Sequence, residues 1–403
     1  MKSLKILLMI AALWSGWNSA FGQTWKQQTN APSHNWASIA CSADGRKLVA
    51  VNDDMYFNGD NFVFYGSIYT STNSGTSWTQ ATNAPPAGWI KVASSADGNN
   101  LVALPADGPI YTSTDSGITW MPINTPSSLL NYIASSADGT KLVSAEWNDF
   151  PPNPSLIFTS TNSGSTWATN NSPNEYWTSI ACSADGTRLV AVGNNPNNAC
   201  PIFTSVDSGK NWNMTSATQA IWSAVASSAD GVTLLAAVSG GQVYASSNSG
   251  TNWTVVTNLP SAAWDYVASS ADGVRLVAAQ DYGGTIYTST NSGATWMQAN
   301  VPSDNWHSVA CSADGNALMA VSFQGLIYGC KTMPRPRLSF APSSSNLALS
   351  WLIPSMNCVP QQSSNLISWV NLTNTPTLNL TNLQNQVVLS PFNISGFFRL
   401  STP

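Results

Sequence analysis

A pattern of thirteen residues recurs seven times along this chain, and it constrains the fold more than any other feature of the sequence. The first copy is IACSADGRKLVAV at residues 39–51, and the other copies begin at residues 92, 133, 180, 225, 267 and 309. Successive copies start 53, 41, 47, 45, 42 and 42 residues apart. This spacing is typical of one four-stranded blade per repeat. We therefore predict an all-β chain whose main domain is a seven-bladed β-propeller.

A second motif, S-x-[DN]-x-G-x-x-W, accompanies six of the seven repeats. Its copies begin at residues 71, 113, 160, 205, 246 and 289. We label the four strands of a blade A to D. The Asp and Gly of SADG predict a tight hairpin turn between strands A and B, and the second motif predicts such a turn between C and D. Asn replaces Asp in four of the six copies, which favours a structural role over metal binding or catalysis.

The second motif resembles the Asp-box, or BNR, repeat of sialidase-type propellers and of the photosystem II assembly factor. The resemblance covers about residues 24–330. It implies the propeller fold, but it implies no single activity, because the motif occurs in proteins of many activities.

The motif count predicts how the ring closes. The seventh repeat has no Asp box, whereas an isolated strand-D sequence, Thr24–Gln27, precedes the first repeat. Its Trp25 corresponds to the tryptophan that ends each Asp box. We therefore expect the N-terminal strand to pair with strand C of the last blade, around Ile327, which leaves no open blade edge.

The N-terminus predicts export. Lys2 and Lys5 precede a short apolar run, and the small residues Ala20 and Gly22 follow it, which is typical of a signal peptide over residues 1–22. An uncleaved anchor helix is the alternative interpretation. The mature chain has no other membrane-spanning segment by sequence, so we predict a secreted or cell-surface protein.

A second domain follows the propeller, which we assign to residues 23–332. A Pro-rich linker is predicted over 333–338 and a small β-sandwich over 339–403, because short alternating strands are separated by turn residues. This part resembles a C-terminal module of exported proteins from Verrucomicrobia-like bacteria. Trp351 and Trp369 are interpreted as core residues, with stacking on sugar rings as the alternative.

The cysteines predict few disulfides. Cys41, Cys182 and Cys311 occupy a position that holds Ser in the other blades, which favours a small buried residue. Cys182 and Cys200 are expected on strands A and C, ~9.6 Å apart and beyond disulfide reach. Cys330 and Cys358 are a possible bridge between the two domains.

Charge sorts the two ends of the propeller. Nine of the 19 acidic residues belong to SADG turns or Asp boxes, whereas ten fall in or beside the B–C and D–A connections. Five basic residues fall at the A–B turns and Lys210 falls at a C–D turn; the five are Arg46, Lys47, Lys141, Arg188 and Arg275. An acidic end can concentrate cationic ligands, and a net charge of −5 without a basic stripe argues against nucleic-acid binding.

The connections that break the repeat are the best candidates for a binding site. The tryptophans that begin strand A recur regularly, so packing is favoured for them. The two histidines, His34 and His307, are interpreted as solvated loop residues, and no metal or cofactor motif is present. The predicted ligand-binding residues are Asp53, Asp54, Tyr56, Phe57, Glu146, Trp147, Asp149 and Asp281.

We predict a non-catalytic, monomeric propeller that binds a glycan or an extracellular protein on this end. A sialidase is disfavoured because all six arginines fall in turns, the linker or the tail, so no arginine triad can hold a substrate carboxylate. Another glycoside hydrolase is the alternative, with Asp53 or Asp54 and Glu146 or Asp149 as its two carboxylates.

Overall fold

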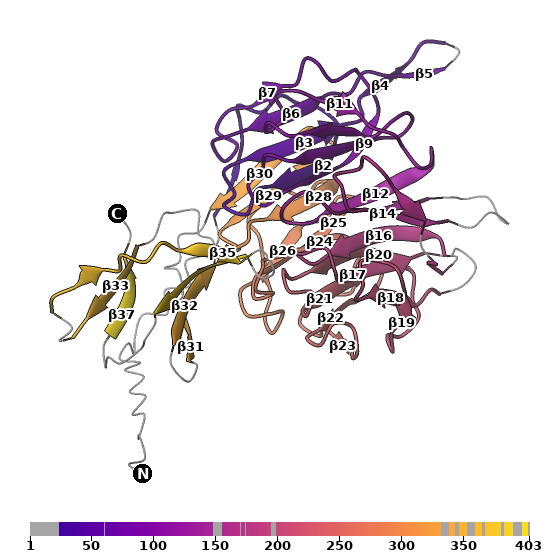
Figure 1. Cartoon of the computed structure of the whole chain (residues 1–403). Coiled ribbons are helices and arrows are strands. Elements are labelled where there is room, and N and C mark those ends of the chain that lie inside the picture. Colours follow the sequence, from indigo (N-terminus) through magenta and orange to yellow (C-terminus); the bar gives the residue numbers. More distant parts are fainter. Residues whose placement is uncertain are drawn as a thin grey trace.

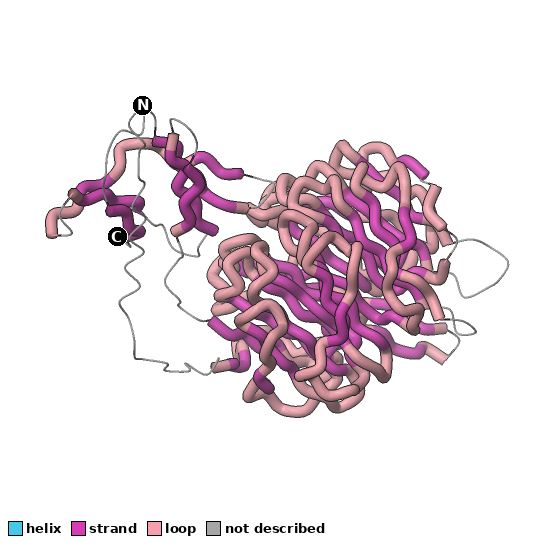
Figure 2. The backbone as a smooth tube through the Cα atoms, turned by 90° about the horizontal axis from the view of Figure 1, so that it is seen from below, coloured by secondary structure: helices cyan, strands magenta, loops and turns pink. Residues whose placement is uncertain are grey.

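The computed structural model describes residues 24–59, 61–147, 155–169, 171–173, 175–194, 199–331, 338–342, 346–352, 359–364, 367–379, 383–389 and 397–401. The predicted signal peptide and nearly all of the predicted linker lie outside these residues. The described chain consists of strands and loops, which confirms the all-β prediction (Figure 2). No helix in this part of the chain is long and apolar enough to cross a membrane.

Seven four-stranded antiparallel sheets follow one another between residues 25 and 331, as a β-propeller requires (Figure 1). Sheet 1 contains β2 (Trp36–Cys41), β3 (Leu48–Asn52), β6 (Ile68–Ser71) and β7 (Thr79–Gln80). Sheet 2 contains β8 (Trp89–Ser94), β9 (Leu101–Pro105), β10 (Tyr111–Ser113) and β11 (Met121–Pro122). Sheet 3 contains β12 (Leu130–Ser135), β13 (Leu142–Glu146), β14 (Ile157–Ser160) and β15 (Ala168–Thr169). Sheet 4 contains β16 (Trp177–Cys182), β17 (Leu189–Gly193), β18 (Ile202–Ser205) and β19 (Asn213–Met214).

The remaining three sheets repeat this order. Sheet 5 contains β20 (Trp222–Ser227), β21 (Leu234–Val238), β22 (Val243–Ser246) and β23 (Thr254–Val255). Sheet 6 contains β24 (Trp264–Ser269), β25 (Leu276–Gln280), β26 (Ile286–Ser289) and β27 (Met297–Gln298). Sheet 7 contains β28 (Trp306–Cys311), β29 (Ala317–Ser322), β30 (Ile327–Lys331) and the N-terminal β1 (Trp25–Gln27). In its register, Trp25 lies opposite Cys330 and Gln27 opposite Tyr328.

The SADG turns join the seven sheets through one circular set of backbone hydrogen bonds. The amide of Ala43 donates to the carbonyl of Ala96, and each SADG alanine donates in the same way to the next sheet. The amide of Ala313 returns to the carbonyl of Ala43 at 2.8 Å. The donors, in order, are Ala43, Ala96, Ala137, Ala184, Ala229, Ala271 and Ala313. We name this set the alanine ring.

Within each SADG turn the aspartate has the structural role that the sequence predicts. In the first turn, the Ser42 hydroxyl and the Arg46 amide both donate to Asp44 Oδ1, and Gly45 has a φ of +66°. In the Asp boxes the position between Asn73 and Gly75 is also left-handed, since Ser74 has a φ of +58°. Such side-chain bonds let the backbone turn tightly without losing its hydrogen-bond partners.

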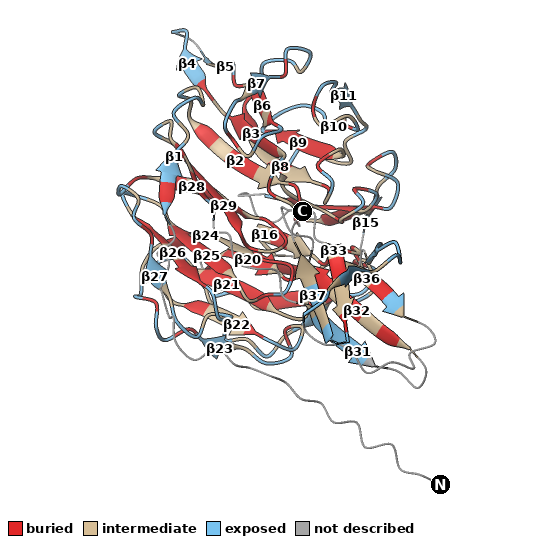
Figure 3. Ribbon diagram, turned by 90° about the vertical axis from the view of Figure 1, so that its left-hand side faces the viewer, coloured by how far each residue is buried: buried red, intermediate tan, exposed pale blue. Residues whose placement is uncertain are grey.

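The core lies between the sheets and is built from their second strands. β3, β9, β13, β17 and β29 are buried along their whole length, and β21 is buried except at its last residue, Val238 (Figure 3). The tryptophans that begin strand A are fully buried, at 0% exposure: Trp36, Trp89, Trp177, Trp222, Trp264 and Trp306. Each meets a Tyr or Phe of strand C in its own sheet edge to face. They are therefore packing residues, as expected.

The cysteines of the propeller are thiols. Cys41, Cys182, Cys311 and Cys330 form no disulfide, so the predicted absence of a Cys182–Cys200 bridge holds. Burial raises the pKa of the Cys41 and Cys182 thiols to about 12. Cys358, the expected partner of Cys330, lies outside the described residues.

The C-terminal strands form two further sheets. One contains β31 (Ser339–Pro342), β32 (Leu347–Leu352), β36 (Gln384–Leu389) and β35 (Thr377–Asn379), and the other β34 (Val370–Asn371), β33 (Val359–Ser363) and β37 (Phe397–Ser401). Trp351 is buried, at 2% exposure, so it cannot stack on a sugar as the alternative interpretation required. Leu383 packs against the alanine ring, and the C-terminal strands accordingly lie at the A–B turn end of the propeller (Figure 1).

A pair of glycine substitutions tests the tight packing of the SADG turns. Gly273 and Gly240 both have a φ of +68°, but a Cβ on Gly273 would lie 2.5 Å from Thr233 Cβ, whereas one on Gly240 would meet nothing within 4 Å. Both Ala variants carry the strain of a left-handed residue, about 1–2 kcal/mol. We expect Gly273→Ala to lose a further 1 kcal/mol or more, roughly, through overpacking. Urea unfolding of both variants measures this difference, and equal losses would contradict it.

Candidate functional site

The end of the propeller that carries the D–A and B–C connections is where the sheets differ most. In all seven sheets the pairing of strands A and B shifts register two residues into strand A. A bulge of this kind re-aims side chains. In three sheets the second residue of the bulge is Ser38, Ser179 or Ser308, whose hydroxyl accepts a bond from the backbone amide of the next sheet. In the others this position is free to vary.

Three large side chains replace serine at this position and extend toward the axis of the propeller, where burial raises the pKa of the Tyr266 hydroxyl and Tyr132 is close enough to contribute. They are Lys91 in sheet 2, Tyr132 in sheet 3 and Tyr266 in sheet 6. Lys91 Nζ lies 5.5 Å from the centroid of the Tyr266 ring. Sheets 2 and 6 are not neighbours in the alanine ring, so this cation–π contact crosses the axis. All three residues are partly exposed.

Sheets 6 and 7 add a histidine and two carboxylates to this cluster. His307 Nε2 lies 3.6 Å from Asp281 Oδ2, and the imidazole lies between the rings of Tyr266 and Phe323, with centroids 6.2 and 5.1 Å away. Asp265 occupies the first residue of the bulge in sheet 6, and its Oδ2 is buried without a hydrogen-bond partner. We name Lys91, Tyr132, Asp265, Tyr266, Asp281 and His307 the axial cluster.

Burial controls the charges of the axial cluster. It lowers the pKa of Lys91 to about 8, and it raises the pKa of the Asp265 carboxyl with help from nearby Asp281. Burial also holds the pKa of His307 below its ordinary value, although Asp281 acts in the opposite direction. At neutral pH the cluster therefore presents one ammonium group beside a neutral imidazole, with acidic side chains around them.

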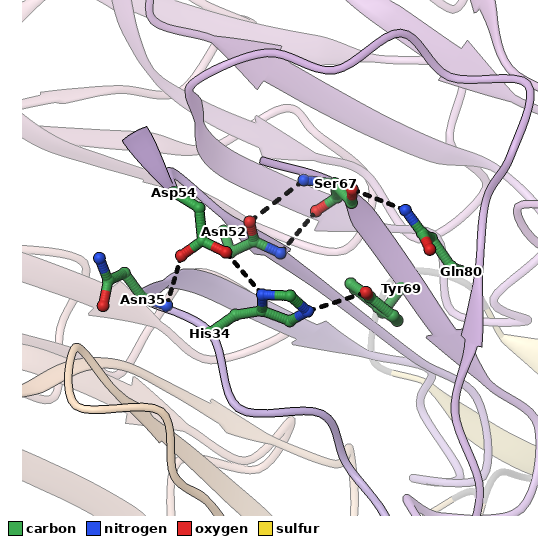
Figure 4. A network of polar contacts seen from close by, with 7 residues as sticks. All are labelled: His34, Asn35, Asn52, Asp54, Ser67, Tyr69 and Gln80. Atoms are coloured by element: carbon green, nitrogen blue, oxygen red, sulfur yellow. Dashed lines mark hydrogen bonds and ion pairs between the residues drawn. The ribbon is translucent and has the colours of Figure 1, made fainter. Parts of the chain in front are cut away.

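A second polar network lies in sheet 1, at the base of the long B–C connection (Figure 4). His34 Nδ1 lies 2.5 Å from Asp54 Oδ2 and its Nε2 lies 2.8 Å from the Tyr69 hydroxyl, while the Asn35 amide donates to Asp54 Oδ1 at 2.8 Å. The side chains of His34 and His307 are both about three-quarters buried, with 24% and 26% exposure. The interpretation of both as solvated loop residues is wrong, because carboxylates and rings enclose them.

The same network holds both ends of that connection. Asn52 and Ser67 exchange two hydrogen bonds of 3.2 Å, and Gln80 Nε2 donates to the Ser67 hydroxyl at 2.8 Å (Figure 4). Gly66 lies so close to its surroundings that a Cβ there would stand 2.1 Å from the Asn52 carbonyl oxygen. The chain between residues 52 and 67 therefore leaves the propeller from a rigid base.

An exposed aromatic hairpin projects from this base. It is formed by β4 (Met55–Phe57) and β5 (Phe62–Phe64), paired antiparallel, and extends from the body at the end opposite to the C-terminal strands (Figure 1). Six large side chains are 40–62% exposed: Met55, Tyr56, Phe57, Phe62, Phe64 and Tyr65. Phe57 and Phe62 pack on each other across the strands at 5.3 Å. We name this feature the aromatic hairpin.

The predicted site residues separate into exposed and buried groups. Tyr56 and Phe57 lie on the aromatic hairpin, and Trp147, at 45% exposure, directly follows β13 of sheet 3. Asp54 and Glu146 are buried. The Asp54 carboxylate accepts a hydrogen bond from the Asn35 amide, and the Glu146 carboxylate accepts one from the Leu156 amide.

Two of the other predicted acids, Asp53 and Asp281, also lie at this end of the propeller. Burial raises the pKa of Asp53, with a further contribution from Asp54. Asp281 is in the axial cluster, whereas Asp149 lies outside the described residues. Sheet 2 separates the residues of sheet 1 from those of sheet 3.

The sequence prediction missed the central residues Lys91, Tyr132, Asp265 and Tyr266 as a group. The signal that could have identified them was present: at one aligned position of strand A, three repeats have Ser, one has Ala and three have Lys or Tyr. A departure at one position within a regular repeat is as informative as an insertion between repeats.

The opposite end of the propeller is occupied by structural contacts. Lys47 Nζ donates to Asn99 and Ser116 of the next sheet, and Lys141 Nζ donates to the Asp185 carbonyl. The two crevices found between sheets at this end have volumes of about 10 Å³ each, which is enough for one water molecule. Neither can hold a ligand.

Comparison with known proteins supports the fold. Residues 23–179, less than half of the chain, match the family model described as the DUF6242 beta propeller domain. The structure is similar to YCF48 bound to D1 peptide, with a TM-score of 0.57 and 17% identity over 77% of this chain and 97% of that one. It is similarly related to YCF48 from Cyanidioschyzon merolae, with a TM-score of 0.56 and 15% identity over 76% and 98%.

A more distant similarity is to the GH74 enzyme of Niastella koreensis, with a TM-score of 0.45 and 13% identity over 84% of this chain and 65% of that one. None of the curated proteins compared with the chain matches it. At 17% and 15% identity the two YCF48 structures establish a β-propeller fold and no activity.

The role of the sheet 1 network can be tested at Tyr69. Phe occupies the same position of strand C in sheets 3 and 4, as Phe158 and Phe203, so Tyr69→Phe removes only the hydroxyl that bonds His34. We expect a loss of about 0.5–1.5 kcal/mol in the free energy of unfolding. Tyr111→Phe is the matched control, because no hydrogen bond of the Tyr111 hydroxyl is found among the described residues. Equal stability of the two variants in urea would contradict the assignment.

Two aspartates should respond to pH with opposite signs. The pKa of Asp265 is raised by burial, so its carboxyl favours the folded state when protonated and loses this contribution as the pH rises through the raised pKa. Burial also acts on Asp185, but hydrogen bonds from Ser183 and Thr187 outweigh it and lower the pKa. Asp185 therefore stabilises the fold above its unfolded pKa and ceases to do so as the pH falls.

We expect Asp265→Asn to increase the free energy of unfolding at pH 7 and Asp185→Asn to decrease it. Each change should be below about 1 kcal/mol, because both carboxylates are partly screened by water. Both effects should shrink toward pH 3, because carboxyl groups take up protons over this range. Thermal unfolding from pH 7 to pH 3 measures them, and a gain from Asp265→Asn that grows as the pH falls would refute the assignment.

Proposed function

We propose that this chain is an exported, monomeric, seven-bladed β-propeller, closed by its N-terminal strand, that binds a protein partner at the D–A and B–C end. The observation that carries the proposal is the aromatic hairpin. Monomeric soluble proteins rarely expose a contiguous group of large apolar side chains unless the group contacts something. Aromatic residues are also the residues most enriched at the energetic centres of protein interfaces.

The rigid base of the hairpin supports a binding role. Asn52, Ser67 and the His34–Asp54 pair hold both ends of the connection, so the base of the hairpin is fixed before a partner arrives. Preorganisation lowers the entropy that binding must overcome. The C-terminal strands lie at the other end of the propeller, where Leu383 meets the alanine ring, and so they leave the hairpin accessible.

A protein partner fits this shape better than a glycan. Small ligands are usually bound in concave sites, whereas the aromatic hairpin projects from the body (Figure 1). The YCF48 structure with a D1 peptide supports the view that a propeller of this fold can bind a polypeptide. The buried and half-buried acids nearby, Asp53 among them, favour a partner with an apolar pocket and a cationic rim.

Export and the role of the last domain are part of the proposal. The signal-peptide pattern of residues 1–22 supports export, and the low charge and Asp-box turns fit an extracellular repeat protein. We assign residues 339–403 to a separate β-sandwich because their strands pair only with one another.

Display of a random peptide library against residues 23–403 tests the proposal. Peptides selected on the wild type should bind at least about ten-fold more weakly to a Tyr56→Ser, Phe57→Ser, Phe62→Ser variant, since each lost aromatic contact costs roughly 1 kcal/mol or more. Ile118→Ser with Val206→Ser is the matched control, because these exposed side chains lie in the C–D turns. Unchanged binding to the hairpin variant would reject the proposed surface. Association of the wild type that the hairpin variant abolishes would instead make a second copy the partner.

A glycoside hydrolase is the second candidate, and one observation favours it. Burial raises the pKa of the Asp265 carboxyl, with a further contribution from Asp281, and a carboxyl with a raised pKa is the general acid of such enzymes. A panel of chromogenic glycosides tests this reading. Turnover that Asp265→Asn abolishes would establish it over the protein-binding proposal.

A further inference from the structure

Lys91 lies where an ammonium group is not expected. Within the described residues, the ion pairs are those of His34 and His307, and Lys91 Nζ makes no hydrogen bond. Its close contact is the face of Tyr266, at 5.5 Å. An ammonium group has three donors and is strongly hydrated in water, so this position leaves most of its bonding capacity to a group from outside.

We propose that Lys91 binds a carboxylate of a peptide segment of the partner at the axis of the propeller. This inference rests on the proposed function, because it places a second contact of the same partner at the same end of the molecule. The ammonium group would donate to the carboxylate in a charge-assisted hydrogen bond. Tyr132, Tyr266 and Phe323 would pack against the neighbouring apolar atoms of the peptide.

The acids beside Tyr266 and His307 define which anions can bind. Asp265 and Asp281 lie close to His307 and Tyr266, so a highly charged group such as a phosphate or a nucleic acid would meet repulsion. A single carboxylate carries only one negative charge. A cationic side chain beside it in the peptide would face these acids favourably. The charge pattern thus selects a carboxylate with a cationic neighbour and rejects polyanions.

The neutral state of His307 fits this arrangement. Burial and Lys91 both lower its pKa, so it does not compete with Lys91 as a second cation at neutral pH. Its imidazole lies between aromatic rings on both sides and forms part of the wall of the cluster.

Three short probes test the proposal on residues 23–403. They are N-acetyl-Lys-Phe with a free C-terminal carboxylate, the same dipeptide as the C-terminal amide, and N-acetyl-Lys-Glu as the C-terminal amide. We expect the acid to bind the wild type about ten-fold more tightly than the Phe amide, which corresponds to one charge-assisted hydrogen bond. If the Glu amide matches the acid, a side-chain carboxylate is the natural ligand, and otherwise a chain terminus is. Either result supports the proposal.

The matched variants are Lys91→Met and Lys210→Met, the latter in a C–D turn. The preference for the acid should disappear in Lys91→Met and persist in Lys210→Met. Lys91→Gln replaces Lys91→Met if urea unfolding shows that the latter does not fold. Equal binding of acid and amide to the wild type, or a preference that survives in both Lys91 variants, would overturn the proposal.

A pH series separates Lys91 from the other groups that face it, namely Tyr132, Asp265, Tyr266, Asp281 and His307. The affinity of the acid probe should fall as the pH rises above about 8, the pKa of Lys91, because the neutral amine loses its charge. This dependence should be absent in Lys91→Met. A dependence that remains there belongs to a neighbour and overturns the assignment.

The outcome is distinct from that of the library experiment. Library peptides that need the aromatic hairpin but show no acid preference would leave the proposed function intact and remove only the role of Lys91. Binding of glucuronate at Lys91, with no binding of either peptide carboxylate, would overturn the peptide ligand in favour of an acidic sugar.

Discussion

The alanine ring is the constraint on which the rest of the propeller depends. Each SADG turn contributes one amide and one carbonyl to it, and the last bond, from Ala313 to Ala43, joins the two ends of the repeat. Buried backbone groups are costly when left without partners. A shift of one sheet would therefore break bonds on both sides. This coupling holds the strand A ends at one radius, and it explains why alanine, with its single methyl group, occupies every position of the ring.

The bulge in strand A is where the site departs from the scaffold. The residue that begins strand A precedes the bulge and the SADG turn follows it, and both hardly differ between sheets. At the bulge itself, serine hydroxyls bond to the next sheet in three places, while Lys91, Tyr132 and Tyr266 extend to the axis instead. The backbone is the same in both cases, so a change of side chain at this position alters the chemistry of the axis without disturbing the blade.

The sequence predicted the elements and turns well because they depend on local chemistry. A turn such as Ser42–Gly45 is specified by residues within four positions of each other, and alternation identifies the buried strands. The site was harder to predict because its contacts are non-local. Asp54 was expected to face a ligand, yet its partners are His34 and Asn35. Glu146 was expected to do the same, yet its carboxylate accepts a hydrogen bond from the Leu156 amide.

The contact between Lys91 and Tyr266 shows why binding sites in repeat proteins are difficult to predict from the sequence. The two residues are 175 positions apart, and the sheets that carry them are not neighbours, so only the diameter of the ring brings them together. A scaffold that repeats must place equivalent residues at equal radius around the axis. Any repeat that substitutes a long side chain at the bulge therefore projects it toward the same point. The side chains that meet there come from single substitutions in separate repeats. Within its own repeat, none of these substitutions stands out.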